Sequence, residues 1–374
     1  MPVMHEVRTG ARHRRAPHAD RRPARCTIVP PHILMALCRS ESAQQREVAL
    51  RTLALDATAR EARLMARVDA ATAERPPAAG PPRKHRSIFD ARGGTALPGV
   101  PVRDEGEAAT GDAAADEAYD GLGATWDLYQ DVYGRNSIDD AGQDLVASVH
   151  YGEQYDNAEW NGTQMLFGDG DGTVFTRFTV AVDVMGHELT HGVTAATANL
   201  TYQDQAGALN ESVSDVFGSL VKQYVAAPRQ TADRADWLIG AGLFTSAVDG
   251  VALRSMKAPG TAYDDPQLGG RDPQPAHMRD YVTTAEDNGG VHINSGIPNH
   301  AFYLVAVGLG GFAWERAGRI WYETLRDPAL AMGAQFADFA ALTVANAADG
   351  FDAAVAQVVR DAWREVGVTP AAGV

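Results

Sequence analysis

The chain has 374 residues, of which 45% are hydrophobic, and this length and composition fit a globular protein of two domains with a large core. The formal net charge is −15, but residues 1–86 hold 17 basic and 8 acidic side chains, a net of +9, and residues 87–374 carry a net of −24. The chain contains no run of about 18 apolar residues, which excludes a membrane-spanning helix. The basic segment and the acidic body should attract each other, and no nucleic-acid-binding motif accompanies the basic residues.

The first segment of the chain holds both cysteines, Cys26 and Cys38, so we expect no disulfide in the main body. Residues 27–37 are the best apolar run near the N-terminus, but two prolines interrupt them, and they make a poor signal-peptide core. We therefore expect no conventional signal peptide.

The rest of the first segment predicts a helix and a linker. We expect residues 1–25 to be disordered. Residues 40–70 are rich in Ala, Arg and Leu, which predicts a helix with Ser40 or Ser42 as its N-cap. Residues 74–86 are rich in proline and basic residues, which predicts an exposed linker that proteases can cut.

The body of the chain divides into a strand-rich part and a helical part. Up to about residue 180, short apolar runs alternate with Gly and Asp turns, and residues 144–152 and 164–180 predict strands joined by turns. The "GDGDG" stretch within the second of these predicts a tight hairpin turn rather than a calcium loop, because no glutamate ends a 12-residue loop. Helical patterns dominate afterwards, over residues 181–196, 209–225, 296–309, 311–325, 335–346 and 351–366. This order predicts an α+β protein of two lobes.

The stretch "VMGHELTHGV", residues 184–193, lies where the two parts meet. On a helix Met185, Leu189 and Val193 share one face with Val182, and His187 and His191 lie on nearly the opposite face. Histidines four residues apart can bind one ion at about 2.0–2.1 Å. Glu188 is displaced by about a third of a turn, where it can reach a metal-bound water.

A tetrahedral catalytic metal site needs a third protein ligand, and residues 207–221 offer one. Glu211 and Asp215 lie four residues apart on one helical face beside an apolar stripe, where two carboxylates are costly to bury without partners. A metal ion for Glu211 and a histidine N–H for Asp215 would satisfy both. The alternative is that the two residues form an exposed acidic face.

These residues resemble the thermolysin family of zinc endopeptidases, over roughly residues 87–367. The resemblance rests on several motifs and their order: "VHYGEQYDNAEWNG", "GDGDG", "VDVMGHELTHGV", "LTYQDQAGALNESVSDVFG", "LRSM", "DNGGVHINSGIPN" and "AWREVGV". The N-terminal "IVPPHIL", ahead of a helix and a linker, resembles the short propeptide of the protealysin-like branch of this family.

The resemblance implies a thermolysin-like zincin of two lobes with the zinc cleft between them. Residues 87–200 would form the sheet-rich N-terminal lobe that ends in the HExxH helix, and residues 201–374 the mainly helical C-terminal lobe. Residues 1–86 would be propeptide and linker. One catalytic Zn²⁺ would be held by three ligands: His187, His191 and Glu211.

The family also implies catalytic roles. Glu188 would take a proton from the zinc-bound water and pass it to the leaving amine. His292, oriented by Asp287, and Tyr202 would stabilise the oxyanion. Other residues would support the histidines or bind the substrate main chain: Asp215 for His187, Asn210 for His191, and Asn157, the Ala158 backbone and Arg254 for the substrate. The alternatives are that His292 is a structural histidine, that Tyr202 is an ordinary core residue, and that Arg254 forms a surface ion pair.

Specificity and calcium binding follow from the same resemblance. The family's hydrophobic pocket is matched by Phe175, Phe178, Val184, Ile239 and Leu253. This pocket implies cleavage before Leu, Phe, Ile or Val, although each residue alone could be ordinary core. Two carboxylates of the family's paired-calcium site are kept and three are replaced: Asp183 and Asp236 are kept, and Lys222, Leu238 and Ala241 stand in place of the others. Because a lysine ammonium repels a cation, we expect this calcium site to be absent.

We expect the first 86 residues to act as an inhibitory, folding-assisting propeptide, removed by cleavage within residues 74–87. A thiolate from Cys26 could fill the open zinc position, and the alternative is an unbonded cysteine.

The expected function is a neutral zinc endopeptidase, made as a precursor, that acts on peptides and proteins and on neither nucleic acid nor membranes. A zinc aminopeptidase would need a site for the free amine, which the sequence does not show. A zinc-bearing pseudoenzyme would not need Glu188, Tyr202 and His292 together. The family implies secretion, and the alternative is a cytoplasmic protein or one exported without a signal peptide.

Overall fold

The computed structural model of the chain describes residues 27–72 and 81–371, and for residues 59–72 it describes the backbone alone. Its N-terminal half contains α1 (Pro31–Leu37), α2 (Ala43–Thr72), β1 (Arg86–Asp90), β2 (Val100–Asp104), α3 (Ala113–Tyr133), β3 (Leu145–Val149), β4 (Ala158–Trp160), β5 (Met165–Phe167) and α4 (Val182–Ala196). Its C-terminal half contains α5 (Asp204–Val225), β6 (Leu238–Ile239), β7 (Arg254–Ser255), β8 (Asp264–Asp265), β9 (Gly270–Arg271), α6 (Asp287–Asn294), α7 (Gly296–Leu309), α8 (Ala317–Arg326), α9 (Phe336–Gly350) and α10 (Ala353–Glu365).

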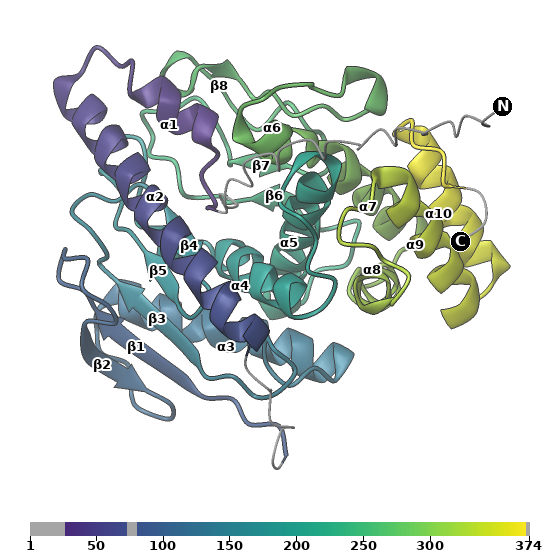
Figure 1. Ribbon diagram of the computed structural model, residues 1–374, viewed down its shortest axis with the longest axis horizontal. Coiled ribbons are helices and arrows are strands. Elements are labelled where there is room, and N and C mark those ends of the chain that lie inside the picture. Colours follow the sequence, from purple (N-terminus) through teal and green to yellow (C-terminus); the bar gives the residue numbers. More distant parts are fainter. Residues whose placement is uncertain (1–26, 73–80, 372–374) are drawn as a thin grey trace, which may run out of the picture.

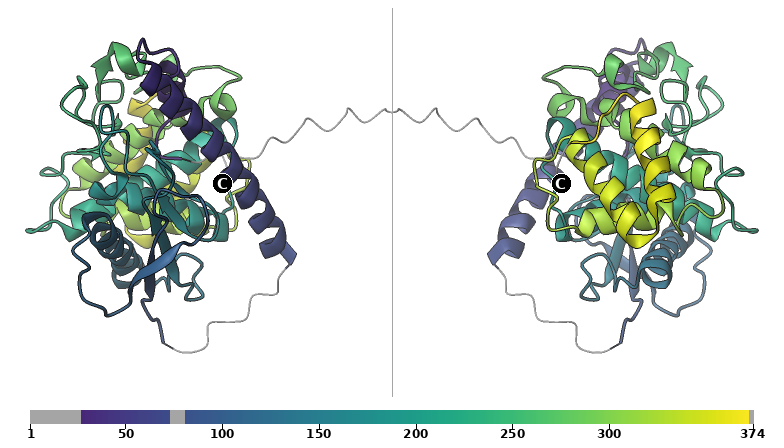
Figure 2. Two further views of the ribbon diagram at one scale, coloured as in Figure 1. Left: turned by 90° about the vertical axis from the view of Figure 1, so that its left-hand side faces the viewer. Right: turned by 90° about the vertical axis from the view of Figure 1, so that its right-hand side faces the viewer.

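The described strands of the first part form a five-stranded sheet in the order β2-β1-β3-β5-β4. The strands β1, β3 and β5 run parallel, and β2 and β4 pair antiparallel at the two edges. The edge strand β4 lies against α4. The sheet and the C-terminal helices α7–α10 lie at opposite sides of the molecule, with α4 and α5 between them (Figure 1 and Figure 2). The expected α+β architecture of two lobes is therefore confirmed.

The helix α3 was not expected, because residues 87–180 predicted strands and turns alone. The helix contains Gly121 and Gly123, which weaken a helical pattern. Both glycines are needed for close packing: a Cβ atom at Gly121 would lie 2.0 Å from the Met185 sulfur, and one at Gly123 would lie 2.4 Å from Nη1 of Arg86. Tertiary packing therefore outweighs helix propensity here.

Other element boundaries also differ from expectation. The turn at "GDGDG" exists, but residues 174–180 form no second strand of a hairpin: Phe175 makes a single bridge to Phe244, and Phe178–Val180 is a 3₁₀ turn. The helix α5 begins at Asp204 rather than residue 209, and α8 begins at Ala317 rather than residue 311. The hairpin was predicted from its turn residues alone, and these do not determine whether the residues after the turn pair with the strand before it.

The N-terminal segment packs onto the body of the protein. Ser42 accepts a hydrogen bond from the Gln45 backbone N–H (3.3 Å), as expected for the N-cap of α2. The helix α2, in purple, crosses the front of the molecule beside β4 (Figure 1). Ile28, Val29 and Ile33 are fully buried in the same hydrophobic core as the body. In the described part of the chain, no helix has the length and apolar character that crossing a membrane requires.

The helices α4 and α5 approach each other closely through two glycines. A Cβ atom at Gly218 would lie 2.4 Å from the Asp183 carbonyl oxygen, and one at Gly186 would lie 2.9 Å from the Gly218 Cα. These positions are within one turn of helix of His187 and Asp215. The spacing of the two helices therefore sets the distance between the histidine pair on α4 and the carboxylates on α5.

Replacing Gly218 with alanine tests this constraint. Because the Asp183 carbonyl belongs to the backbone and cannot rotate away, we expect Gly218→Ala to lower the free energy of unfolding by about 1–3 kcal/mol and to weaken metal binding. Urea unfolding and metal analysis of the purified protein measure both effects. Gly333→Ala is the matched control, since a Cβ atom at that position would meet no described atom within 4 Å. Equal stability of the two variants would show that this close approach is not a constraint.

Candidate metal centre

The two histidines of α4 converge on one point. The Nε2 atoms of His187 and His191 are 3.0 Å apart. Each ring is held from behind, because Nδ1 of His187 lies 2.8 Å from Oδ1 of Asp215 and Nδ1 of His191 lies 2.8 Å from Oδ1 of Asn210. Both rings are buried. The expected partners of both histidines are therefore in place.

These contacts decide where the histidine protons lie. A carboxylate and an amide oxygen can only accept hydrogen bonds, so each Nδ1 carries the proton in the neutral ring. Two Nε2 lone pairs then face each other, and the Glu211 carboxylate lies 3.5 Å from each of these nitrogens. Tetrahedral zinc ligands at about 2.0–2.1 Å lie about 3.3 Å from one another. The three side chains therefore fit one divalent ion, and the alternative of an exposed acidic face is wrong because Glu211 and Asp215 are buried.

Asp215, the partner of His187, is itself held by Arg254 and Asn299. Its carboxylate accepts from Nε and Nη2 of Arg254 at 2.9 and 2.8 Å and from Nδ2 of Asn299 at 2.8 Å. Burial opposes ionisation of Asp215, but Arg254 and His187 outweigh it and hold the pKa of this carboxyl well below its ordinary value. Arg254 is therefore buried in an ion pair, and the alternative of a surface ion pair is wrong.

Glu188 lies in the same cluster but is held by a different element. Its Oε2 accepts from the backbone N–H of Trp160 in β4, at 2.8 Å. The ligand atoms of Glu188, His187 and His191 lie within 4.8 Å of one another. Glu211 faces both histidine nitrogens at 3.5 Å, so its carboxylate is also placed to hold a metal ion. Glu188 then lies beside the metal position, tied to the edge of the sheet.

Two further side chains face the metal centre, His292 on α6 and Tyr202 just before α5. His292 Nδ1 lies 2.7 Å from Oδ1 of Asp287, and the same carboxylate accepts from the His292 backbone N–H at 2.9 Å. Burial lowers the pKa of His292, but the carboxylates of Asp287 and Glu211 outweigh it and raise that pKa to about 9. The Tyr202 hydroxyl lies 3.3 Å from His292 Nε2 and donates a short hydrogen bond to Glu211. Both side chains are buried beside the metal position.

The N-terminal segment enters this site. The Ile28 backbone N–H donates to the Ala158 carbonyl of β4 at 3.2 Å, and the Ile28 carbonyl accepts from Nη1 of Arg254 at 3.0 Å. The Val29 backbone N–H donates to Oδ1 of Asn157 at 3.0 Å. Residues 27–29 thus form hydrogen bonds with Asn157, Ala158 and Arg254, the three residues that are predicted to bind a substrate main chain.

Two further residues of the N-terminal segment contact the site and were not predicted. The Thr27 carbonyl oxygen lies 3.2 Å from His292 Nε2. The buried carboxylate of Asp56 on α2 accepts from Nδ2 of Asn157 at 3.1 Å and from the Tyr155 hydroxyl at 2.7 Å. The sequence showed only an aspartate within a helix rich in Ala, Arg and Leu, and this does not identify the partner of Asp56. Cys26 lies outside the described residues.

The predicted hydrophobic pocket residues are all buried in the main hydrophobic cluster: Phe175, Phe178, Val184, Ile239 and Leu253. The first two rings lie 5.5 Å apart, and the Leu253 N–H donates to the Ile239 carbonyl at 3.0 Å. Ile28 belongs to the same cluster.

At the position that corresponds to the family's paired-calcium site, Lys222 Nζ lies 3.3 Å from Oδ2 of Asp183 and 2.9 Å from Oδ2 of Asp236. It also donates to the Leu238 carbonyl at 3.1 Å. Burial lowers the pKa of Lys222, but the two carboxylates outweigh it and raise that pKa. The ammonium group thus makes oxygen contacts of the kind that a bound cation makes.

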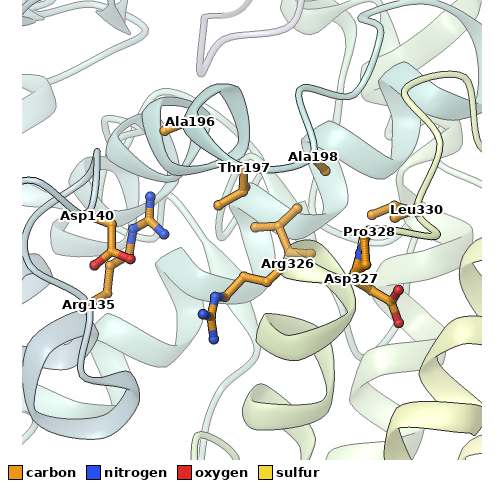
Figure 3. Close-up of a pocket in the computed structure, with 10 residues that line it drawn as sticks. Arg135, Asp140, Ala196, Thr197, Ala198, Arg326, Asp327, Pro328 and Leu330 are labelled. Carbon is orange, nitrogen blue, oxygen red and sulfur yellow. The ribbon is translucent and has the colours of Figure 1, made fainter. Parts of the chain in front are cut away.

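A cavity of about 340 Å³ lies elsewhere, where the C-terminal end of α4 meets the end of α8 (Figure 3). It is lined by Arg135, Asp140, Ala196, Thr197, Ala198, Leu325, Arg326, Asp327, Pro328 and Leu330. None of the predicted site residues lines it, so it is separate from the metal centre.

Comparisons with known proteins agree with this geometry. The family model described as the catalytic domain of thermolysin metallopeptidase matches residues 81–195, and that described as its alpha-helical domain matches residues 198–368. An extracellular metalloprotease of Pectobacterium carotovorum subsp. carotovorum is 50% identical over 349 residues, which cover 92% of this chain and 96% of that protein. A thermolysin of Alicyclobacillus acidocaldarius subsp. acidocaldarius is 40% identical, over 75% of this chain and 50% of that protein.

The solved structure of the precursor of protealysin, a metalloproteinase from Serratia proteamaculans, is similar with a TM-score of 0.83. The two sequences are 53% identical, and the match covers 92% of this chain and 100% of that one. Both the relatives and the family models describe metallopeptidases, which act by hydrolysing peptide bonds. The chain therefore belongs to the thermolysin family of metallopeptidases, in its protealysin-like branch.

Proposed function

We propose that the protein is a zinc endopeptidase that cleaves before bulky hydrophobic residues and is made as an autoinhibited precursor. The main support for this proposal is the way in which residues 27–29 bind at the site. This segment is internal to the chain, and it hydrogen-bonds Asn157, Ala158 and Arg254 through its backbone. A site that binds an internal segment suits an endopeptidase, whereas an aminopeptidase must bind a free chain end.

His187, His191 and Glu211 would hold the metal. Zn²⁺ bound there would supply Lewis acidity, which polarises the peptide carbonyl and lowers the pKa of a water molecule. Glu188 is the proposed general base. The hydrogen bond from the Trp160 N–H fixes one carboxylate oxygen, so the group is already oriented to take a proton from water and return it to the leaving amine.

His292 and Tyr202 are the proposed donors to the carbonyl oxygen as it gains negative charge. The Asp287 carboxylate orients His292, so that Nε2–H points away from Asp287 and toward the Thr27 carbonyl. The Tyr202 hydroxyl lies 3.3 Å from the same nitrogen. Two donors fixed before the reaction stabilise developing charge without having to reorganise.

The proposed specificity follows from Ile28. Its backbone lies at Ala158 and Arg254, and its side chain is fully buried in the main hydrophobic core of the protein, to which the five pocket residues also belong. Burial of an apolar side chain in such a pocket is favourable, whereas burial of a charged side chain is unfavourable. We propose that residues such as Leu, Phe, Ile and Val follow the cleaved bond.

The N-terminal segment is the proposed inhibitor. Residues 27–29 take the place of a substrate main chain, and Asp56 on α2 accepts a hydrogen bond from the side-chain amide of Asn157. A substrate cannot bind until this segment leaves. We propose that cleavage within residues 74–87 releases it, and that the protein is secreted like the relatives that are named extracellular metalloproteases.

We also propose that the protein needs no calcium at the position of Lys222. The ammonium group already forms ion pairs with Asp183 and Asp236, and a divalent cation would have to displace it. Packing and this ion pair then stabilise the region that calcium would otherwise hold together.

The role of Glu188 predicts the behaviour of Glu188→Gln. The amide still accepts from the Trp160 N–H but cannot take a proton, so hydrolysis of a blocked dipeptide should fall about 10²–10⁴-fold. Zinc content, measured on the same preparation, should stay at one ion per chain. Loss of zinc would make Glu188 a ligand, and unchanged hydrolysis would remove it as the base. Hydrolysis of N-terminally blocked peptides by the unaltered protein distinguishes the endopeptidase from an aminopeptidase.

The contact between Asp215 and His187 predicts weaker metal binding in Asp215→Asn. An amide orients the imidazole less strongly than a carboxylate, and we expect zinc affinity to fall about 10–100-fold. Competition with a zinc chelator measures it. Ser212→Ala on the same helix is the control, because the Ser212 hydroxyl is buried and has no hydrogen-bond partner among the described residues. Equal affinity in both variants would contradict the proposed role.

The ion pair of Lys222 predicts the effect of its removal. Lys222→Ala leaves the buried Asp183 carboxylate without its cation, and the free energy of unfolding should fall by about 1–3 kcal/mol. Adding Asp183→Asn should restore part of the loss, because the uncompensated charge is gone. Urea unfolding measures both, and added calcium should leave the unaltered protein unchanged. A clear stabilisation of the unaltered protein by calcium would contradict the proposal.

A further inference from the structure

The backbone of residues 27–29 is bound in one defined register. The Ile28 N–H donates to the Ala158 carbonyl, the Ile28 carbonyl accepts from Arg254, and the Val29 N–H donates to Asn157. Each group on the body therefore meets successive backbone groups of the segment. Such a ladder fixes which peptide bond lies at the catalytic side chains.

The bond at that position joins Thr27 to Ile28. The Thr27 carbonyl oxygen is 3.2 Å from His292 Nε2, the proposed donor to the oxyanion. The Ile28 N–H on the other side of the bond is bound at the edge strand β4, which also supplies the Trp160 N–H to Glu188. The proposed oxyanion donor thus lies at the carbonyl side of this bond, and the strand that hydrogen-bonds the proposed base holds the N–H side.

The side chain after the bond agrees with the proposed specificity. Ile28 has no exposed surface and lies in the hydrophobic cluster that contains the pocket residues. We infer that the peptide bond Thr27–Ile28 is a substrate of the protein's own active site and is cut within the same molecule. This inference rests on the proposed function, because it uses the same base, donors and pocket.

The reaction is a hydrolysis with water as the co-reactant. A water oxygen forms a bond to the Thr27 carbonyl carbon while Glu188 takes its proton. The bond between this carbon and the Ile28 nitrogen then breaks, and the proton passes from Glu188 to that nitrogen. The products are a carboxylate at Thr27 and an amine at Ile28, and no electrons are gained or lost.

The cut does not release the inhibitor. The Val29 N–H keeps its bond to Asn157, and Asp56 on α2 keeps its contacts with Asn157 and Tyr155. His32 lies 2.8 Å from the Tyr263 hydroxyl and adds a further contact. A precursor cut at Thr27–Ile28 should therefore stay inactive until the chain is also cut within residues 74–87.

Mass spectrometry of the full-length precursor, purified and incubated with zinc, tests this inference. We expect a species that begins at Ile28 to appear before or together with the cut within residues 74–87. Its rate of formation should not depend on protein concentration, because the bond lies in the molecule's own site. In the Glu188→Gln precursor the bond should stay intact, and hydrogen–deuterium exchange should show slow exchange of the Ile28 and Val29 amides.

Two variants of Ile28 serve as a matched pair. Ile28→Asp places a charge in the pocket, and cutting at this bond should slow by about 10–200-fold, whereas Ile28→Leu should keep it. Hydrolysis of a blocked dipeptide by the released enzyme should be the same in both, because residue 28 is no longer present. An intact Thr27–Ile28 bond in a protein that hydrolyses the dipeptide would overturn the inference and leave the proposed function standing. Failure to hydrolyse the dipeptide would overturn both.

Discussion

The structure depends on two imidazole nitrogens that face each other at 3.0 Å. Their Nδ1 protons are committed to Asp215 and Asn210, so their lone pairs repel unless a cation lies between them. The Glu211 carboxylate beside them adds a buried negative charge. A divalent ion relieves both the repulsion and the charge, and this explains why so many polar groups can be buried at one place. The close approach of α4 and α5 brings the carboxylates to the histidines. The ion pair with Arg254 keeps Asp215 in place beside His187.

Sequence periodicity and spacing predicted which side chains of the candidate metal centre lie close together, because each of its parts is local. The histidine pair lies on one helix and the two carboxylates on another, so helical spacing alone brought each pair to one face. The fold class and most C-terminal helices were predicted for the same reason. The helix α3 was missed because Gly121 and Gly123 weaken its pattern, and their use lies in contacts with distant residues.

The contacts of the N-terminal segment could not be read from local patterns. Val29 and its partner Asn157 are 128 residues apart, and Asp56 and Asn157 are 101 residues apart. The resemblance to short propeptides indicated a role for this segment but not the register in which it binds. That register decides which bond faces His292, and only the assembled structure supplies it. The proposed inhibition and the proposed self-cleavage thus depend on the same few backbone hydrogen bonds.

Anomalous X-ray diffraction at the zinc absorption edge, from crystals of the full chain grown with zinc, tests the metal centre most directly. We expect one strong peak about 2.0–2.2 Å from the Nε2 atoms of His187 and His191 and from a carboxylate oxygen of Glu211. A peak coordinated by Glu188 in place of Glu211, or no peak between the two imidazoles, would contradict it.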